Sequence, residues 1–263
     1  MKTLTEIGRV ERKPVLDDRP LKKRVGLIIL ATDHTTEPDF QRLVAGPDIG
    51  VYVARIAYAN PTTPENLRKM QPALSDAAGL ILPDEPLDAL CYSCTAASVV
   101  IGEAAIRAAI RAGKPDVPVI TPSAAGIAGL RALGACRISL LTPYTVGTTR
   151  PMVKYFARAG FEIARATCLD LEDDREMARI ATNDLVALAK MAMAPDADAL
   201  FISCTAVRAA LAATEIEAAI GRPMVSSNLA TAWVCLRLCG VDGPHARSAQ
   251  LMLRPLPASW DQT

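Results

Sequence analysis

Short apolar runs recur along the chain and alternate with longer segments in which apolar residues follow helical spacing. This alternation is typical of parallel sheets that helices cover on both faces. The runs predict strands at residues 25–30, 50–57, 89–93, 117–121, 137–141, 161–166, 199–203 and 223–226. The helical spacing predicts helices at residues 64–79, 98–112, 149–159, 174–192, 206–220 and 230–239.

The pattern of the first half returns in the second half. Residues 89–96 and 199–206 both read Ala-Leu-x-x-Ser-Cys-Thr-Ala, 110 positions apart, and residues 50–55 match 160–165 at the same distance. A period this long indicates a duplicated domain rather than a solenoid. We therefore predict an α/β fold with two pseudo-symmetric lobes, each a parallel sheet of about four strands flanked by helices. Residues 1–20 are expected to form an N-terminal arm, 21–128 with 236–263 the first lobe, and 129–235 the second.

Composition excludes several partners. The 263 residues carry 29 basic and 28 acidic side chains, so we expect no positive electrostatic potential that would attract nucleic acid. The apolar runs are shorter than the roughly 18 residues of a membrane span, and the charged start lacks a signal-peptide core. Seven cysteines form no disulfide framework. These features predict a cytoplasmic protein without nucleic-acid or membrane partners, and they leave homo-oligomer formation open.

The candidate chemistry lies where strands end. Ligands of open α/β sheets bind beyond the carboxyl ends of the strands, and Cys94 and Cys204 stand there. A thiol at a helix N-terminus faces unpaired amides that favour the thiolate. The following Thr95 and Thr205 offer hydroxyls and N–H groups to a carboxylate. If the lobes face each other, both thiols flank one small molecule between them.

The cysteine spacing and the absence of other motifs bear on the choice of chemistry. Cys91-x-x-Cys94 fits a redox or zinc pattern, but Cys91 lies inside the strand, its counterpart is Phe201, and no second metal pair follows. The chain has no GxGxxG, Walker or Ser-His-Asp pattern. We therefore expect no metal and no cofactor. A non-catalytic module that binds a small acid stays open, and rapid alkylation of two thiols would argue against it.

These features resemble the aspartate/glutamate racemase superfamily, and within it the maleate isomerase and arylmalonate decarboxylase branch. The resemblance covers roughly residues 22–240. Three motifs carry it: residues 129–134 (Gly-Leu-Arg-Ala-Leu-Gly), the strand 137–141 that leads into Thr142-x-Tyr144, and Val225-Ser226-Ser227-Asn228 running into Trp233. Ectoine-utilisation proteins of that branch look nearest. Its decarboxylases keep the second cysteine and have glycine at the first position, so two cysteines favour an isomerase or racemase.

The resemblance implies roles for particular residues. Cys94 matches the nucleophile of the first half, Cys204 its partner, and Tyr144 the tyrosine that binds a substrate carboxylate. His34 and Asp174 stand where maleate isomerases have asparagine. The predicted substrate-binding residues are His34, Thr35, Thr95, Ala96, Tyr144, Asp174 and Thr205.

The expected activity is that of a cofactor-independent two-cysteine isomerase or racemase acting on a small carboxylic acid, either maleate cis-trans isomerase-like or amino-acid racemase-like. The alternatives are an arylmalonate-type decarboxylase and the binding module. An ionised Asp174 would repel a dianion, so we expect a substrate with one carboxylate and a donor group, such as an amino acid or an N-acylated diamino acid.

Overall fold

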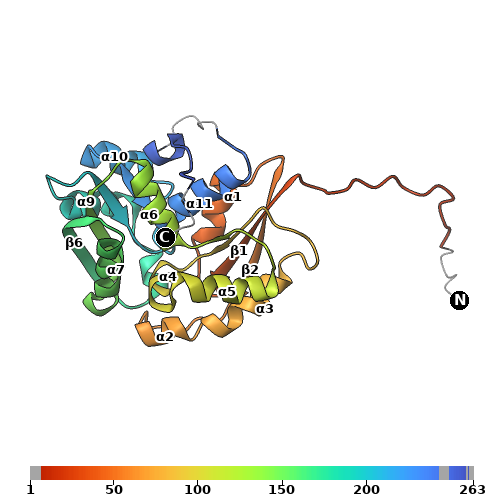
Figure 1. The fold of residues 1–263 in the computed structure, drawn as a ribbon, viewed down its shortest axis with the longest axis horizontal. Coiled ribbons are helices and arrows are strands. Elements are labelled where there is room, and N and C mark those ends of the chain that lie inside the picture. The colour runs from red at the N-terminus through yellow and green to blue at the C-terminus, as the bar shows by residue number, and fades with distance from the viewer. Residues whose placement is uncertain (1–6, 243–248, 259, 261–263) are drawn as a thin grey trace, which may run out of the picture.

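Two four-stranded parallel sheets form the centre of the molecule (Figure 1). The computed structural model describes residues 7–242, 249–258 and 260. The first sheet has the strand order β2-β1-β3-β4 and the second has the order β6-β5-β7-β8. Their strands are β1 (Lys23–Leu30), β2 (Ile49–Ile56), β3 (Ala89–Tyr92), β4 (Val119–Ile120), β5 (Arg137–Tyr144), β6 (Glu162–Leu171), β7 (Ala199–Ile202) and β8 (Met224–Ser226).

Both sheets use the same register around their cysteine segments. Leu27 of β1 lies opposite Cys91 of β3, and Leu140 of β5 lies opposite Phe201 of β7. β3 and β7 are buried along their whole length, as strands covered on both faces should be. The predicted α/β fold with two similar lobes is confirmed, and the duplication extends to individual pairs of residues.

Helices cover both sheets (Figure 1). They are α1 (Thr36–Leu43), α2 (Pro64–Arg68), α3 (Leu74–Leu80), α4 (Thr95–Ile101), α5 (Glu103–Gly113), α6 (Pro122–Ala132), α7 (Val146–Arg158), α8 (Asp174–Met177), α9 (Thr182–Ala192), α10 (Ala213–Ile220) and α11 (Ser227–Leu238). Two 3₁₀ turns accompany them, η1 (Gln71–Ala73) and η2 (Gln250–Leu253).

Several predicted helices are interrupted in the structure. The segment 64–79 divides into α2, η1 and α3, with Pro72 in the 3₁₀ turn between the helices. The segment 98–112 divides at Gly102, whose φ of 94° ends α4. The segment 174–192 divides into α8 and α9. Ile180 lies between these two helices, and its carbonyl accepts a hydrogen bond from the Arg208 side chain. The sequence pattern did not predict α1 or α6.

The last helix of each lobe packs on the other sheet. α6 follows β4 but contacts β7 and β8, while α11 follows β8 but contacts β3, β4 and α1. Gly126 of α6 permits this approach, because a Cβ there would lie 2.6 Å from the Phe201 ring. α6 and α11 also pack against each other. The exchange ties the two sheets into one body and brings the carboxyl ends of their strands together.

The chain before β1 has a different character. Residues 7–20 are exposed, form no helix or strand, and extend away from the sheets (Figure 1). Residues 1–6 of the predicted arm, and 243–248, 259 and 261–263 of the predicted first lobe, lie outside the described residues. The predicted domain boundaries therefore stay a prediction. Within the described part of the chain, none of the helices combines the length and hydropathy that a membrane crossing requires.

Candidate active site

Cys94 and Cys204 leave their strands in the same way. The amide of Ser93 donates to the carbonyl of Ile28, and the amide of Ser203 donates to the carbonyl of Leu141, at 2.8 and 2.9 Å. Each cysteine then follows at the carboxyl edge of its sheet. Both side chains are buried, with exposures of 7% and 8%.

One small cavity brings the two cysteines together. It has a volume of about 20 Å³, which is room for about one water molecule. Residues of both lobes line it: Leu30, Asp33, Tyr58, Thr62, Cys94, Thr95, Ala96, Tyr144, Asp174, Met177, Cys204, Thr205 and Ala206. The lining holds two carboxyl groups, and neither lysine, arginine nor histidine is among these described residues.

The two thiols differ in the donors around them. The Cys94 sulfur accepts from the amide of Ala97, in the first turn of α4. The Cys204 sulfur accepts from the amides of Ala206 and Val207 and from the hydroxyl of Tyr144. Burial raises the pKa of Cys204 to about 12 and that of Cys94 higher still, and these hydrogen bonds oppose the effect. While the cavity is closed, desolvation of the two thiols therefore has a larger effect on their pKa than the helix N-terminus that we expected to favour the thiolate.

The segment after Cys204 is not the helix that the sequence predicts. Residues 205–212 form turns, and α10 begins only at Ala213. The carbonyl of Thr205 accepts from Asn228 at 2.9 Å, and the carbonyl of Ala206 accepts from Thr35 at 2.7 Å. These carbonyls would otherwise accept the first bonds of a helix. Side chains from elsewhere in the fold therefore displace the helical turn.

Tyr144, at the end of β5, faces Cys204. Its hydroxyl donates to the Cys204 sulfur and accepts from the Ser203 hydroxyl at 3.3 Å. Burial raises the pKa of Tyr144 above its usual value, so the phenol keeps its proton. The residue expected to bind a carboxylate thus has a thiol as its neighbour in the closed cavity.

The two threonine hydroxyls join the lobes. Thr95 donates to the hydroxyl of Ser227 at 2.7 Å, and Thr205 donates to the carbonyl of Ser93 at 3.2 Å. The first bond connects the start of α4 to the start of α11, and the second connects the segment after β7 to the segment after β3. Because the hydroxyl protons are used here, donation to a substrate is left to the backbone amides of these segments.

Asp174 forms a clamp across the opening between the lobes. Its carboxylate accepts a hydrogen bond from the hydroxyl of Thr32, which follows β1. It also accepts one from the side-chain amide of Asn60, which follows β2, at 2.9 Å. The neighbouring Glu172 carbonyl accepts from the Thr62 amide at 2.8 Å. The clamp therefore connects α8 of the second lobe to two loops of the first lobe.

His34 and Thr35 are separated from the other predicted residues. His34 is exposed and lines a second, open cavity of about 630 Å³ with Thr35, Asp173, Arg175, Glu176, Ala178, Arg179 and Arg208. Thr35 is buried, although it also lines this outer cavity. α8 forms the partition, since Asp174 and Met177 face the inner cavity and Arg175 and Glu176 line the outer one.

Sequence reasoning missed four polar or flexible residues of the inner cavity: Asp33, Tyr58, Thr62 and Met177. Asp33 accepts from the amides of Thr35 and Thr36 at 2.8 and 2.7 Å, and burial raises its pKa. Tyr58 and Thr62 share a hydrogen bond of 2.7 Å. The Asp-x-Thr-Thr sequence before α1 is a local capping signal that could have identified Asp33. Tyr58 carries no comparable signal.

No metal-binding cluster occurs in the described part of the chain, where no three His, Cys, Asp or Glu side chains are close enough to hold an ion together. The cavity offers the two thiols, the phenol of Tyr144, and the carboxyl groups of Asp33 and Asp174. A paired thiol site of this kind can transfer protons or add to an activated carbon.

Comparisons with known proteins agree with this arrangement. A maleate isomerase from Nocardia farcinica is 28% identical over 226 residues, which cover 82% of this chain and 89% of that protein. An arylmalonate decarboxylase from Bordetella bronchiseptica is 34% identical over 146 residues, which cover 55% of this chain and 60% of that protein. The solved structure of a cysteine-to-serine mutant of N. farcinica maleate cis-trans isomerase, with a covalently bound succinylcysteine intermediate, superposes with a TM-score of 0.79 at 24% identity. The match covers 88% of this chain and 98% of that one.

The fold therefore defines a two-lobed α/β protein of the maleate isomerase and arylmalonate decarboxylase group. Residues 98–252 match the family model described as arylmalonate decarboxylase. The chain belongs to the arylmalonate decarboxylase family, and the resemblance inferred from its sequence motifs is confirmed. The nearer link to ectoine-utilisation proteins stays a prediction.

Proposed function

We propose that this chain is a cofactor-independent isomerase or racemase in which Cys94 and Cys204 act on a small carboxylic acid. The observation that carries the proposal is the placement of both thiols, one from each lobe, on a single enclosed cavity. A thiol on either side of a bound carbon can remove a proton from one face and return it to the other. A decarboxylase of this branch has glycine at the first position, where this chain has Cys94.

Two reactions use this geometry. In a racemase, the thiolate of one cysteine removes the proton alpha to the carboxylate, and the thiol of the other protonates the resulting carbanion on the opposite face. In an isomerase, one thiolate adds to an alkene carbon, and the electron pair moves onto the adjacent carbon and its carboxylate. Rotation about the new single bond and expulsion of the thiolate give the trans alkene. The succinylcysteine in the N. farcinica relative supports the second reaction.

The charges of the cavity favour one substrate class. Asp174 brings a carboxyl group to a lining that contains no basic side chain among the described residues. A dianion such as maleate would meet repulsion there, whereas a substrate with one carboxylate and a nitrogen donor would not. We therefore propose an amino acid or an N-acylated diamino acid as the substrate class, with its donor directed toward Asp174.

Entry of such a substrate requires the cavity to open. It now holds about one water, and α8 separates it from the outer cavity that contains His34. Movement of α8 would release the Asp174 bonds to Thr32 and Asn60 and join the two spaces.

The reaction is tested by assaying the enzyme in D₂O with single enantiomers of amino acids and N-acylated diamino acids, and with maleate and aryl malonates. Racemisation with deuterium at the alpha carbon is expected. Fumarate formation from maleate would identify the isomerase instead, and carbon dioxide from an aryl malonate would identify the decarboxylase.

The role of Asp174 is tested with Asp174→Asn, which keeps the shape of the side chain and removes its charge. Turnover of the amino-acid class is expected to fall and turnover of maleate to rise. Efficient maleate isomerisation by the unmodified enzyme, with no gain in Asp174→Asn, would contradict the proposed substrate class and leave the two-thiol mechanism standing.

A further inference from the structure

A buried carboxylate outside the inner cavity is connected to the turn that follows Cys204. Asp39 belongs to α1, is 2% exposed and is absent from the cavity lining. Among the described residues, its carboxylate accepts one hydrogen bond, from the side-chain amide of Asn228 at 2.9 Å. Asp33, which is also buried, accepts three, from two amides and a hydroxyl. A negative charge on Asp39 is therefore stabilised by few donors.

Asn228 connects this carboxylate to the backbone beside Cys204. It lies in the first turn of α11 and is buried. Its side-chain nitrogen donates to Asp39 and to the carbonyl of Thr205, both at 2.9 Å. Its side-chain oxygen is buried and has no partner in the described part of the chain. The amide therefore uses both of its N–H groups on two acceptors and leaves its own acceptor unused.

The charge of Asp39 fixes the direction of that amide. An ionised carboxylate only accepts hydrogen bonds, and so does the Thr205 carbonyl. If the Asn228 amide rotated by half a turn, its oxygen would face two acceptors, so the observed orientation is strongly favoured. A protonated Asp39 has a hydroxyl that needs an acceptor, and the unused oxygen of Asn228 can supply it. Rotation of the amide to form this bond would take the donor away from Thr205.

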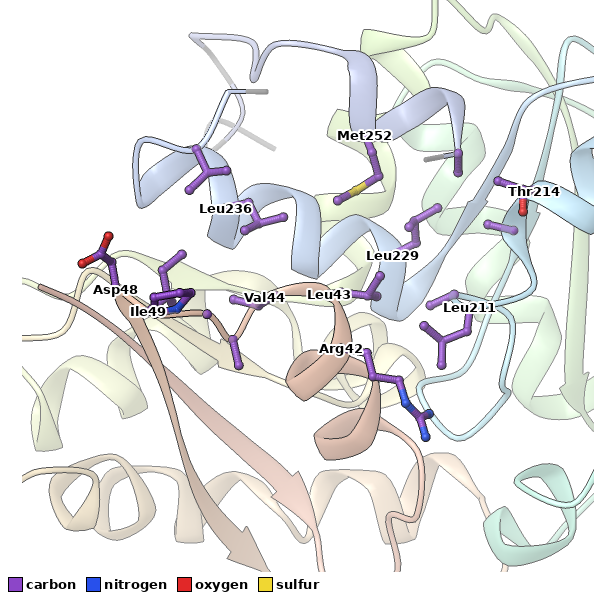
Figure 2. A pocket seen from close by; sticks show the side chains of 17 residues that line it. Arg42, Leu43, Val44, Asp48, Ile49, Leu211, Thr214, Leu229, Leu236 and Met252 are labelled. Atoms are coloured by element: carbon purple, nitrogen blue, oxygen red, sulfur yellow. The ribbon is translucent and has the colours of Figure 1, made fainter. Parts of the chain in front are cut away.

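The bond between Asp39 and Asn228 is the one side-chain hydrogen bond that joins α1 to α11, both of which are fully described. The two helices pack against each other, and they also border an apolar groove of about 440 Å³ (Figure 2). Leu43 of α1 and Leu229 of α11 line this groove, whereas Asp39 and Asn228 do not. Protonation of Asp39 therefore acts on a buried polar contact within an otherwise apolar interface.

The surroundings of Asp39 raise its pKa to about 6, which is close to physiological pH. Burial has the largest effect, the bond from Asn228 opposes it, Asp33 raises the pKa further, and Arg42 lowers it. β1, β2 and α11 pack against α1. Their charged side chains have partners of their own: Lys23 and Arg24 of β1 pair with Asp88 and Glu85, Arg55 of β2 pairs with Glu37, and Arg237 of α11 donates to the carbonyls of Val241, Met252 and Arg254.

We infer that Asp39 is a positioning residue for Cys204: its ionised form holds Asn228 against the Thr205 carbonyl, and its protonation releases the turn after Cys204. That turn directs the amides of Ala206 and Val207 at the Cys204 sulfur, where they stabilise the thiolate. Release should therefore lower the reactivity of Cys204. Cys94 should not respond, because its amide donor belongs to α4. The reactivity of the thiol is measured directly, so the inference can fail while the proposed function stands, and the reverse.

The ratio of Cys204 to Cys94 alkylation by iodoacetamide, followed by mass spectrometry from about pH 5 to about pH 8, tests the inference. Both thiols have pKa values above this range, so without coupling their thiolate fractions rise in parallel and the ratio is constant. With coupling, the ratio should be lower by about threefold or more on the acid side of a step near pH 6, the loss expected from one hydrogen bond. A constant ratio would overturn the inference.

Asp39→Asn keeps the shape of the side chain and removes its charge at every pH. The step should disappear, and the ratio should have its acid value throughout. A step that persists in this variant would belong to another carboxyl group, such as Asp33, and would overturn the inference. Because the raised pKa means that ionised Asp39 opposes folding above about pH 6, urea denaturation at about pH 8 should find Asp39→Asn at least as stable as the unmodified chain.

Arg42→Gln gives a second measurement that does not change Asp39 itself. Removal of this cation disfavours the Asp39 carboxylate, so the midpoint of the step should move to higher pH, most clearly at low ionic strength. Arg111→Gln, at an exposed arginine of α5, is the matched control and should leave the midpoint in place. A midpoint that is the same in both variants would contradict the assignment of the step to Asp39.

Discussion

The two cysteine segments share the sequence Ser-Cys-Thr-Ala and leave their strands with different backbones. Cys94 has a φ of −151° and caps α4, which begins at the next residue. Cys204 has a φ of 89°, a conformation that is rare for a residue with a side chain, and is followed by turns. Strained backbone of this kind gathers at functional sites, where surrounding contacts maintain it.

The difference comes from bonds that only one segment makes. Asn228 and Thr35 donate to the carbonyls of Thr205 and Ala206, and these bonds stabilise the turns that the second segment forms in place of a helix. The same turn directs two amides at the Cys204 sulfur, and Tyr144 adds a hydroxyl. Duplication thus preserved the positions of the two thiols, while tertiary contacts gave Cys204 more donors than Cys94.

The largest expected effect comes from removing either thiol. Cys94→Ala and Cys204→Ala should each lower kcat by about a thousandfold or more, because residues that act as a unit do not substitute for each other. Steady-state assays measure the loss, and circular dichroism verifies the fold. Cys91→Ala serves as the control, since Cys91 lies inside β3, away from the cavity lining. Substantial activity in either variant would remove the basis for a two-thiol mechanism.

Removal of Asn228 should have the next largest effect. Asn228 donates to Asp39 and to the Thr205 carbonyl, both at 2.9 Å, and burial already raises the pKa of Asp39 to about 6. Asn228→Ala would leave these buried acceptors without a donor, which costs about 2–3 kcal/mol of unfolding free energy. Urea denaturation measures the cost. Alkylation followed by mass spectrometry should show a larger change at Cys204 than at Cys94, and equal changes would contradict the local role of Asn228.

Tyr144→Phe should separate the ionisation of the two thiols. It removes one hydrogen bond to Cys204 and should raise the pKa of that thiol, because such a bond stabilises the thiolate by about 1–1.5 kcal/mol. Below the pKa the thiolate fraction then falls, so alkylation of Cys204 should slow about tenfold at a given pH. The pH profile of Cys94 serves as the internal control and should not move. A Cys204 profile that stays in place would show that the phenol does not stabilise the thiolate.

The smallest effect is expected at Thr35. Thr35→Val keeps the size of the side chain and removes its bond to the Ala206 carbonyl, so the unfolding free energy should fall by about 1 kcal/mol. Thr35→Ser keeps the hydroxyl and should retain most of that stability. Chemical denaturation of the two variants gives the comparison. Equal stabilities would indicate that the bond contributes nothing to the turn after Cys204.

Much of the fold and part of the site could be predicted from the sequence. The strands were recognisable because strands buried on both faces appear as continuous apolar runs. The repeat placed Cys94 and Cys204 at equivalent strand ends, and parallel sheets expose those ends together. The helix interruptions at Gly102 and Pro72 also arise from local sequence, but the apolar residues around them keep helical spacing, so the pattern predicted continuous helices.

The amino-acid sequence by itself determined the two parallel sheets of a duplicated chain and the position of the two cysteines at equivalent strand ends, because these depend on local apolar pattern and on the repeat. Only the tertiary structure decided the exchange of α6 and α11, the turn after Cys204, the contact of Tyr144 with a thiol, and the position of His34 outside the inner cavity. Each of these depends on hydrogen bonds or packing between residues far apart in the chain. Such contacts leave no periodic signal in the sequence, because their free energy arises only when the two lobes meet.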